Sequence, residues 1–256
     1  MSYIIDTHAH LDMYDNWDEI YDNAQNSNVK KIIIPAVETQ YFQKIIDIAN
    51  CKENIYCMVG IFPSEAKTWT DEILDTMKDL AKNKKVVAIG EIGLDYYWDT
   101  SFNEKQKEVF IKQIKLANEL NLPIAVHDRE AHKDVFDILK EHNKGSEVVF
   151  HCFSGSPEFA KECVKEGWYI ALGGVVTFKN AVKAKDVAKV VPLDKLLLET
   201  DSPYLTPVPF RGKENQPAYT TYVAEEIANL REMNTNELIR ITTENAERVF
   251  KIWKKD

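Results

Sequence analysis

The sequence predicts an α/β protein whose fold is a (β/α)₈ TIM barrel. Three observations lead to this fold: the chain has 256 residues, short runs of β-branched residues recur along it, and longer stretches with helical spacing separate these runs. This length is typical of one barrel domain, so we expect a single domain over residues 1–256. Two smaller domains and a doubly wound open sheet are the competing organisations.

The predicted strands are continuous apolar runs rather than alternating ones. Such runs are expected for parallel strands because helices cover the outer face of the sheet. The runs are Tyr3–Thr7, Lys31–Val37, Ile55–Ile61, Val86–Ile92, Pro123–Val126, Val148–Phe150, Trp168–Leu172 and Leu196–Glu199. Strands that alternate with helices in this number favour a closed parallel barrel.

Sequence patterns typical of helix starts lie between the apolar runs. Ser101 is followed three residues later by Glu104, a capping-box pattern, and an amphipathic stretch then continues to Leu120. Ser156 precedes Pro157, which places a good N-cap before a proline at the first helical position. These signals predict helices after the fourth and sixth runs.

The C-terminal part of the chain begins with a loop rich in proline. This loop extends from Pro203 to Pro217, where proline removes backbone donors and favours turns. Two helical stretches follow the loop, and we expect the second to open near Thr243–Asn245.

Composition limits the partners of the protein. The net charge of −9 excludes an extended basic surface for nucleic acid, so such contacts must be local, and it disfavours anionic membranes. The start lacks the basic, apolar pattern of a signal peptide, and no uncharged apolar run approaches about 18 residues. Four cysteines without a CxxC pair are typical of reduced thiols. We therefore expect a cytoplasmic protein with no membrane and no obligate protein partner.

Residues that bind metals fall at the carboxyl ends of five predicted strands. The first run ends in His8-Ala9-His10, the fourth in Gly90-Glu91, the fifth in His127, the sixth in His151 and the eighth in Asp201. In a barrel these ends converge on one mouth, where active sites of this fold are built. A single histidine at a strand end is more often structural, but six metal-type residues at five such ends indicate a metal site.

The number of candidate ligands indicates two divalent ions. His8 and His10 are two residues apart on a strand, so their side chains share one face. Imidazole and carboxylate together suit zinc, manganese, iron or, with more oxygens, magnesium. One ion takes three or four protein ligands, and a carboxylate such as Glu91 can bridge two ions in phosphoryl chemistry. His132 and His142 lie on the predicted helix after the fifth run and are expected to be solvated.

These motifs resemble the TatD family of metal-dependent deoxyribonucleases, among the amidohydrolase-type barrels. The resemblance spans nearly the whole chain in order. It is carried by Asp6-Thr7-His8-Ala9-His10-Leu11-Asp12, Gly90-Glu91-Ile92-Gly93-Leu94-Asp95-Tyr96, His127-Asp128-Arg129-Glu130-Ala131, His151-Cys152-Phe153-Ser154-Gly155, Glu199-Thr200-Asp201-Ser202-Pro203-Tyr204 and Arg211-Gly212-Lys213-Glu214-Asn215.

The resemblance implies a (β/α)₈ barrel that hydrolyses DNA, with a 3′-to-5′ exonuclease tendency on single-stranded ends and with Mg, Mn or Zn as the two divalent ions. It also implies ligand roles. His8, His10, Glu91 and Asp201 match one metal site, and Glu91, His127 and His151 match the second. Two departures concern substrate range: the family often has histidine at the position of Phe62, and glutamate at the position of Gln216.

Further roles follow for residues near the ligands. We expect Asp201 and Glu91 to be catalytic, with Asp201 orienting a metal-activated water and accepting its proton. Asp6, Asp95 and Glu199 are candidate carboxylates that fix histidine tautomers. Arg129 is a candidate phosphate contact. Arg211 and Lys213 are either further phosphate contacts or ordinary surface charges of the proline-rich loop. Tyr96, Tyr97 and Trp98 suit an unpaired base or simple packing of a loop.

Three other functions use the same residues. A metal hydrolase of amides or lactones needs similar ions, but many such barrels bridge them with a carboxylated lysine. Glu91 occupies that role here, which favours phosphodiester hydrolysis by resemblance. An ester hydrolase of aminoacyl-tRNA keeps a nucleic-acid substrate, and RNA is a further alternative to DNA. A scaffold without catalysis is disfavoured because a complete ligand set has no structural purpose at a barrel mouth.

Overall fold

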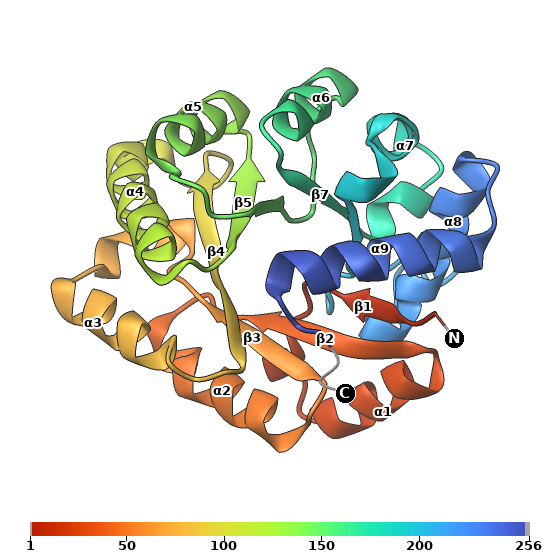
Figure 1. Ribbon diagram of the computed structural model, residues 1–256, viewed down its shortest axis with the longest axis horizontal. Helices are drawn as coiled ribbons and strands as arrows, with labels where there is room; N and C mark the ends of the chain where they lie inside the picture. The colour runs from red at the N-terminus through yellow and green to blue at the C-terminus, as the bar shows by residue number, and fades with distance from the viewer. Residues whose placement is uncertain (1, 254–256) are drawn as a thin grey trace. The chain divides into compact units, whose positions relative to one another are not determined.

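The chain folds as a (β/α)₈ barrel, which confirms the fold predicted from the sequence (Figure 1). The computed structural model describes residues 2–253. Eight parallel strands follow one another in the sheet order β1-β2-β3-β4-β5-β6-β7-β8. The backbone N–H of Thr7 donates to the carbonyl of Leu198 over 3.1 Å. Because this bond joins the end of β1 to β8, the last strand lies beside the first and the sheet is closed.

All eight predicted runs form strands, and their ends differ from the prediction by at most three residues. The strands are β1 (Ile4–Asp6), β2 (Val29–Pro35), β3 (Ile55–Val59), β4 (Val86–Asp95), β5 (Ile124–Arg129), β6 (Val148–Phe150), β7 (Tyr169–Leu172) and β8 (Leu196–Leu198). The largest extensions are in β4 and β5, where Gly93 pairs with His127 and Asp95 pairs with Arg129. Pairing between these two strands therefore continues through their metal-type residues.

Helices follow the strands along the chain. They are α1 (Trp17–Asn26), α2 (Phe42–Cys51), α3 (Asp71–Leu80), α4 (Asn103–Leu120), α5 (His132–His142), α6 (Pro157–Lys165), α7 (Val182–Val190), α8 (Thr220–Leu230) and α9 (Thr235–Phe250). The cap predicted for α6 is confirmed, because the Ser156 hydroxyl accepts a hydrogen bond from the N–H of Phe159 at 3.2 Å.

Two helix starts differ from the prediction. Ser101 does not cap α4: it lies in a 3-10 turn, Thr100–Phe102, and its backbone N–H donates to the Asp99 carboxylate at 2.9 Å. The last helix begins at Thr235 rather than near Thr243. The Asn234 side chain accepts hydrogen bonds from the first turn of α9, so the true N-cap lies two turns earlier than the polar residues around Thr243 indicate.

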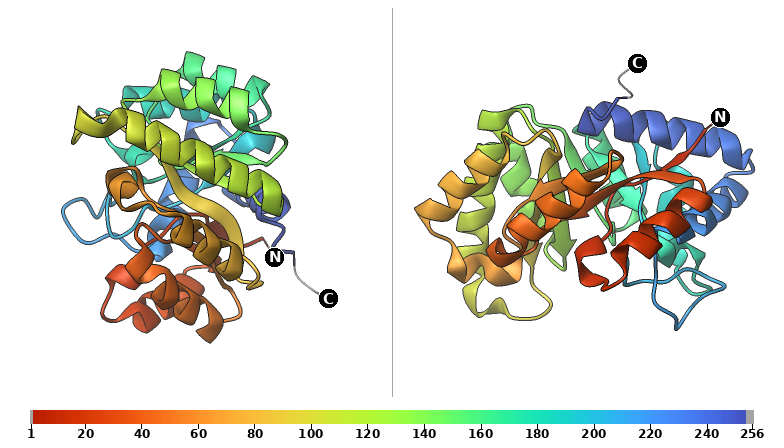
Figure 2. Two further views of the ribbon diagram at one scale, coloured as in Figure 1. Left: turned by 90° about the vertical axis from the view of Figure 1, so that its left-hand side faces the viewer. Right: turned by 90° about the horizontal axis from the view of Figure 1, so that it is seen from below.

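The chain divides into two compact units. One contains Met1–Ile34 and His151–Asp256, and the other contains Pro35–Phe150. The first unit therefore holds β1, β7, β8, nearly all of β2, and α1 with α6 to α9; the helices α8 and α9 pack against each other within it (Figure 2). The second unit holds β3 to β6 with α2 to α5. The expectation of one domain stays a prediction.

The first unit has a buried ion pair near the start of β1. Lys31 on β2 is 3% exposed, and its ammonium donates to Glu247 at 2.8 Å and to the carbonyl of Ile252 at 2.6 Å. The Tyr3 hydroxyl also donates to Glu247. Because a buried ammonium is tolerated only when its donors are satisfied, these contacts fasten α9 to β1 and β2.

In the second unit, β3 and β4 approach each other closely. A Cβ atom added at Gly60, which follows β3, would lie 2.7 Å from the carbonyl carbon of Gly90 on β4. Such a separation is shorter than real Cβ contacts, so the backbones can meet at this point only because Gly60 has no side chain. The contact fixes β4 one residue before Glu91.

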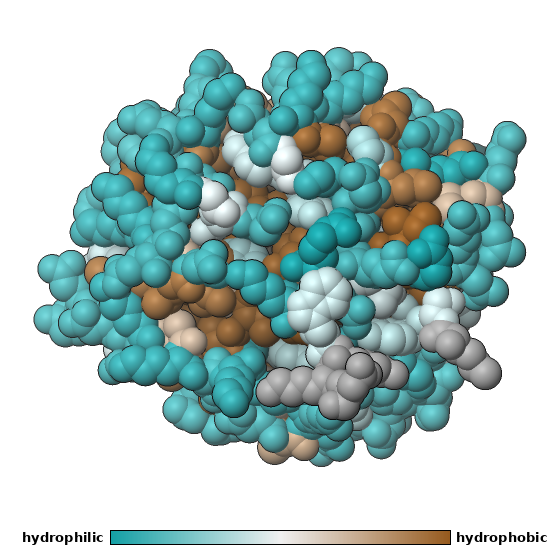
Figure 3. All heavy atoms as spheres, viewed as in Figure 1, coloured by the Kyte–Doolittle hydropathy of each residue, from teal (hydrophilic) through white to brown (hydrophobic). Residues whose placement is uncertain are grey.

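The surface and the thiols bear on the expectations drawn from composition. Hydrophilic side chains make up most of the face shown in Figure 3. Across residues 2–253, no helix combines the length and the apolar character needed to cross a membrane. The four cysteines are free thiols; Cys57 and Cys163 are buried, whereas Cys51 is exposed.

Candidate metal centre

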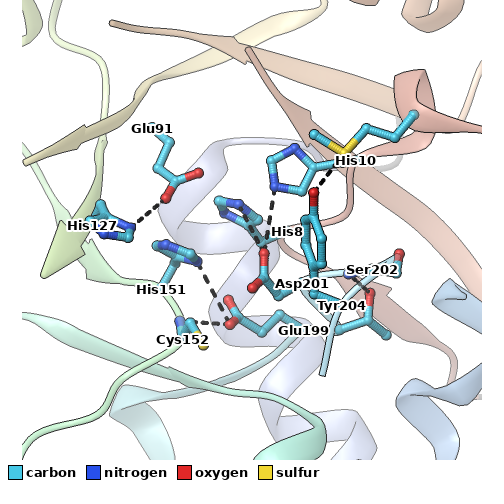
Figure 4. A network of polar contacts seen from close by, with 12 residues as sticks. His8, His10, Glu91, His127, His151, Cys152, Glu199, Asp201, Ser202 and Tyr204 are labelled. Atoms are coloured by element: carbon cyan, nitrogen blue, oxygen red, sulfur yellow. Dashed lines mark hydrogen bonds and ion pairs between the residues drawn. The ribbon is translucent and has the colours of Figure 1, made fainter. Parts of the chain in front are cut away.

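In the first unit, His8, His10 and Asp201 come together at the paired ends of β1 and β8 (Figure 4). The N–H of Asp201 donates to the carbonyl of His8 at 2.9 Å, and Ala9 forms a parallel bridge with Ser202. This pairing sets the register of the two segments. The Nε2 atoms of His10 and His8 lie 3.5 and 3.8 Å from Oδ1 of Asp201. Both histidines are buried.

The backbone at Asp201 is in the left-handed region, with φ of 54°. Residues other than glycine rarely adopt this conformation, although aspartate and asparagine tolerate it best, and it is concentrated at functional sites. Burial alone would raise the pKa of this carboxyl. The hydrogen bond with His10 and the nearby charges of His151 and His8 outweigh burial, so the pKa of Asp201 is lowered and the group is ionised.

A second cluster in the same unit shares His8 and adds His151 and Glu199. The rings of His8 and His151 are stacked, with centroids 3.9 Å apart and an interplanar angle of 12°. Nδ1 of His151 lies 3.9 Å from Oε1 of Glu199, and the same oxygen accepts a hydrogen bond from the N–H of Cys152 at 2.6 Å. One ligand atom from each of the three residues lies within 4.8 Å of the others.

Glu199 is therefore within reach of a metal ion, a role that sequence reasoning did not give it. Its side chain is fully buried, and it precedes Asp201 by two residues at the end of β8. The signal available in the sequence was its position directly after β8, where metal-type residues of this fold gather.

In the second unit, His127 lies between the carboxylates of Glu91 and Asp95; Figure 4 shows its contact with Glu91. Its Nδ1 is 2.8 Å from Oε1 of Glu91, and its Nε2 is 3.0 Å from Oδ2 of Asp95. Burial would lower the pKa of His127, but the bonds to Asp95 and Glu91 outweigh it and raise the pKa to about 9. Asp95 thus holds the imidazole as expected from the sequence, and this contact fixes the ring orientation.

Asp6 does not contact an imidazole ring in the way expected from the sequence. Its carboxylate accepts hydrogen bonds from the hydroxyl of Thr200 at 2.6 Å, from the N–H of Thr200 at 3.0 Å and from the N–H of His8 at 3.2 Å. Burial raises its pKa to about 7 despite these bonds. Asp6 therefore fixes the backbone of the two segments that carry His8 and Asp201.

The donor set of each unit fits a divalent metal. The first unit brings three imidazoles and two carboxylates together, and the second pairs one imidazole with two carboxylates. Nitrogen and oxygen donors in this mixture are the ligands of zinc, manganese and iron, while magnesium prefers more oxygens. Buried carboxylates carry a large desolvation cost unless they are paired or bind metal, and Glu91, Glu199 and Asp201 each lie beside an imidazole that could share a metal ion with them.

The candidate substrate residues of the second unit lie beside this histidine. The Phe62 ring packs edge to face on His127, with centroids 4.5 Å apart. The Arg129 guanidinium lies 3.8 Å from the ring centroid of Tyr97 and 5.2 Å from that of Trp98. Tyr96 instead donates its hydroxyl to Asp134 at 2.8 Å. The exposed aromatic rings at this position are therefore those of Tyr97 and Trp98.

The remaining candidates lie on the proline-rich loop and on α5. Arg211 stacks on Phe178 at 3.7 Å, and Lys213 lies 5.6 Å from the ring of Phe210. His132 and His142 lie on α5, as predicted, at its first and last positions. They are half-buried rather than fully solvated, and His132 pairs with Asp128 at 2.7 Å. The Gln216 amide oxygen accepts a 3.3 Å hydrogen bond from Asn23.

Comparisons with known proteins agree with this geometry. A family model described as TatD related DNase matches residues 5–251. An uncharacterized metal-dependent hydrolase of Bacillus subtilis, YabD, is 48% identical over 255 residues, which are 97% of this chain and 99% of YabD. The corresponding hydrolase YcfH of Escherichia coli K12 is 38% identical, and the match covers 98% of this chain and 96% of YcfH.

Solved structures give the same result. The crystal structure of YjjV, a TatD homologue from Escherichia coli K12, has a TM-score of 0.90 and 32% sequence identity, and the match covers 97% of this chain and 98% of YjjV. A hydrolase of the TatD family from Entamoeba histolytica has a TM-score of 0.86 at 24% identity, over 98% of this chain and 99% of that chain. This second likeness bears on the fold alone.

Proposed function

This chain belongs to the family of TatD-related DNases and is a metal-dependent hydrolase, and from this premise we propose that it removes nucleotides from the ends of single-stranded DNA. The observation that carries the proposal is the pair of clusters that share His8, one with His10 and Asp201 and the other with His151 and Glu199. Two adjoining donor sets are the arrangement that two-metal phosphodiester hydrolysis requires.

The proposed ligands are the six residues at the strand ends: His8, His10, Glu91, His127, His151 and Asp201. By likeness to the family, these residues would hold two divalent ions, Mg, Mn or Zn, and Glu199 would be an additional candidate ligand because of its position beside His151. When bound, such ions lower the pKa of water and neutralise charge on the phosphate. Asp95 then has the role of holding the His127 ring in one orientation.

Asp201 is the proposed proton acceptor. Its pKa is lowered by the hydrogen bond with His10 and by the neighbouring histidines, so the carboxylate is ionised at neutral pH. General base catalysis needs an unprotonated group held in a fixed position. The backbone bond from the N–H of Asp201 to the carbonyl of His8 supplies that position.

Single strands are the proposed substrate because of Arg129, Tyr97 and Trp98. Trp98 is 72% exposed and Tyr97 is 49% exposed, and both pack against the Arg129 guanidinium. Exposed rings of this kind stack on unpaired bases, and a guanidinium pairs with phosphate. A net charge of −9 provides no extended basic track for a duplex. A direct substrate contact of Tyr96 stays a prediction.

The test compares substrates in parallel. Metal-reconstituted enzyme is incubated with linear single-stranded DNA, the same strand closed into a circle, linear RNA and aminoacyl-tRNA. We expect mononucleotides from the first time points on linear DNA, and no cutting of the circle. A phosphorothioate linkage at the 3′ end, but not at the 5′ end, should block digestion if the direction is 3′ to 5′. Equal rates on circle and linear strand would show internal cutting and would contradict the proposal.

The Asp201→Asn variant, purified in the same way, excludes a contaminating nuclease. Its activity should be at least about a hundred times lower, the smallest usual effect of removing a general base. Preferred hydrolysis of RNA or of the aminoacyl ester would change the substrate class while keeping the same site. For location, we propose the cytoplasm, to be tested by cell fractionation.

A further inference from the structure

The first unit contains a cavity of about 420 Å³ that the proposed chemistry does not use. It lies among the residues that follow β6, the residues that follow β7 and the first turn of α7. Its lining includes Cys152, Phe153, Leu172, Val176 and Ala184. The volume lies near the lower end of the range of about 300–1,000 Å³ for small-molecule sites, so it suits one small ligand.

One wall of this cavity is bonded directly to the His8–His151–Glu199 cluster. The N–H of Cys152 donates to Oε1 of Glu199 at 2.6 Å, and the carbonyl of Leu172 accepts from the N–H of Glu199 at 3.2 Å. A Cβ atom added at Gly173, another lining residue, would lie 3.5 Å from Cγ of Glu199. The cavity therefore adjoins the cluster, since three of its lining residues contact Glu199.

The chemistry of the walls favours a flat, largely apolar group with a charged attachment. Phe153, Leu172 and Val176 are buried apolar side chains. The polar lining consists of Ser154, Asn180 and Lys183, all of which are exposed at the rim. An apolar interior with a few polar groups and one ammonium at the entrance matches an aromatic heterocycle that carries a phosphate.

The aromatic wall is held in a fixed orientation. The Phe153 ring stacks on Phe159 of α6, with centroids 5.7 Å apart and an interplanar angle of 16°. A Cβ atom at Gly155 would lie only 2.7 Å from Cζ of Phe153, so the ring packs directly over the glycine backbone. A ring that is already fixed loses little entropy when a ligand stacks on it.

From these observations we propose that the cavity binds the terminal nucleobase of the strand whose end is cut. The inference rests on the proposed function and deepens it. The cavity has room for one base with its sugar but not for a continuing strand, so it selects a free end. The terminal base enters the cavity, and the phosphate that follows it is presented to the adjacent cluster.

The test fills the cavity. Ala184 lines it from α7 and is half-buried, so Ala184→Trp puts an indole into the space that the base would occupy. The matched control is Lys189→Trp, which puts the same side chain at an exposed position of the same helix. Stacking of one base contributes about 1–3 kcal/mol, so kcat/KM on linear single strands should fall about 5- to 150-fold in Ala184→Trp and stay unchanged in the control.

A substrate with an abasic nucleotide at the attacked end supplies the matched substrate control. Wild type should cut it about 5- to 150-fold more slowly than the normal end, and Ala184→Trp should cut it as fast as wild type does. Equal wild-type rates on abasic and normal ends would overturn the proposal. So would an equal loss in Ala184→Trp on both substrates, because the cavity would then act without contacting the base.

Direct binding separates this inference from the proposed function. Wild type without added metal should bind deoxyadenosine monophosphate in calorimetry, Lys189→Trp should bind it equally, and Ala184→Trp should lose at least about 5-fold in affinity. Binding that is absent in wild type, or unchanged in Ala184→Trp, would overturn the inference even if DNA is hydrolysed. Binding that behaves as expected without hydrolysis of any strand would instead contradict the proposed function. If Ala184→Trp does not fold, wild type is tested with a bulky dye on the terminal base. This dye should slow the first cut, and the same dye on an internal base should not.

Discussion

Replacing Asp201 by asparagine should separate the fold of this protein from its function. Asparagine keeps an oxygen at the same position and tolerates the φ of 54° found there. The backbone bond to the carbonyl of His8 does not involve the side chain. The substitution therefore changes the charge at the end of β8 and very little else.

The expected effect on the metal-free fold is small because two contributions oppose each other. The lowered pKa of Asp201 means that the folded protein favours the ionised carboxylate; this stability is present above the unfolded pKa of about 3.9 and is lost as pH falls through the folded pKa. The charge of Asp201 also disfavours ionisation of the buried Asp6. We expect a net change within about 1 kcal/mol, which is about 2–4 °C in Tm for a chain of this size.

The expected effects on metal binding and catalysis are large. A divalent ion at 100 times its Kd stabilises the folded state by about 2.7 kcal/mol, which corresponds to a rise of about 5–11 °C in Tm. Asp201→Asn should lose most of that rise because one carboxylate ligand is neutral. Its kcat should fall about 10²- to 10⁴-fold because the proton acceptor is missing.

The assay is thermal unfolding with chelator and with manganese, together with rates on linear single-stranded DNA. The control is Asp186→Asn, an exposed aspartate on α7, which should leave all three quantities unchanged. Full activity of Asp201→Asn would refute the assigned role as proton acceptor. Loss of cooperative unfolding in chelator would show instead that Asp201 is needed for folding.

Three further perturbations test separate parts of the molecule. Lys31→Met should lower the Tm by about 6–20 °C, since breaking a buried ion pair costs about 3–5 kcal/mol, without changing kcat; exposed Lys161→Met is the control in unfolding experiments. Trp98→Ala should raise KM for single strands about 5- to 150-fold, whereas Trp253→Ala, also at an exposed tryptophan, should have no effect, and equal KM values would remove Trp98 from the substrate site. The pKa of His127 is raised to about 9, so protonated His127 stabilises the metal-free fold below about pH 6.5 and this contribution, about 3 kcal/mol at most, is lost as pH rises to 9; an NMR titration that places this pKa near 6.5 would contradict the bonds to Asp95 and Glu91.

The strands could be predicted from the sequence because they depend on a local pattern, and the same pattern singled out the candidate ligands. Continuous β-branched runs identified all eight strands, and His8, Glu91, His127, His151 and Asp201 became candidates because they lie at or just after the ends of such runs; their role as ligands stays a prediction. The start of α9 was predicted wrongly for a similar reason. Thr243 and its polar neighbours resemble a cap, but Leu238 and Ile239 are buried one turn earlier, and Asn234 supplies the cap.

What the sequence did not predict depends on contacts between segments far apart in the chain. The stacking of His8 on His151 and the bonds from Asp6 to Thr200 depend on how the ends of β1 and β8 are paired, and no single stretch encodes that register. The extension of β4 and β5 has the same origin, since Gly93 is held in the strand by pairing with His127. The left-handed backbone of Asp201 is also stabilised by its neighbours rather than by its own preference.

The two ends of β1 have different surroundings: a hydrogen-bonded ion pair lies at its start, and the candidate metal ligands lie at its end. At its start, Tyr3 accepts a hydrogen bond from Thr243 through its carbonyl and donates to Glu247 through its hydroxyl, beside the buried Lys31. These bonds join β1, β2 and α9 within the first unit, so the group contributes stability. At its end, three buried imidazoles, the buried carboxylate of Glu199 and the half-buried carboxylate of Asp201 gather at distances that suit ligands of a metal better than ordinary hydrogen bonds. In this fold, stability is usually concentrated at the amino ends of the strands and function at the carboxyl ends. The contacts of Lys31 therefore lie apart from the candidate ligands, and their loss should lower the Tm without moving the ligands.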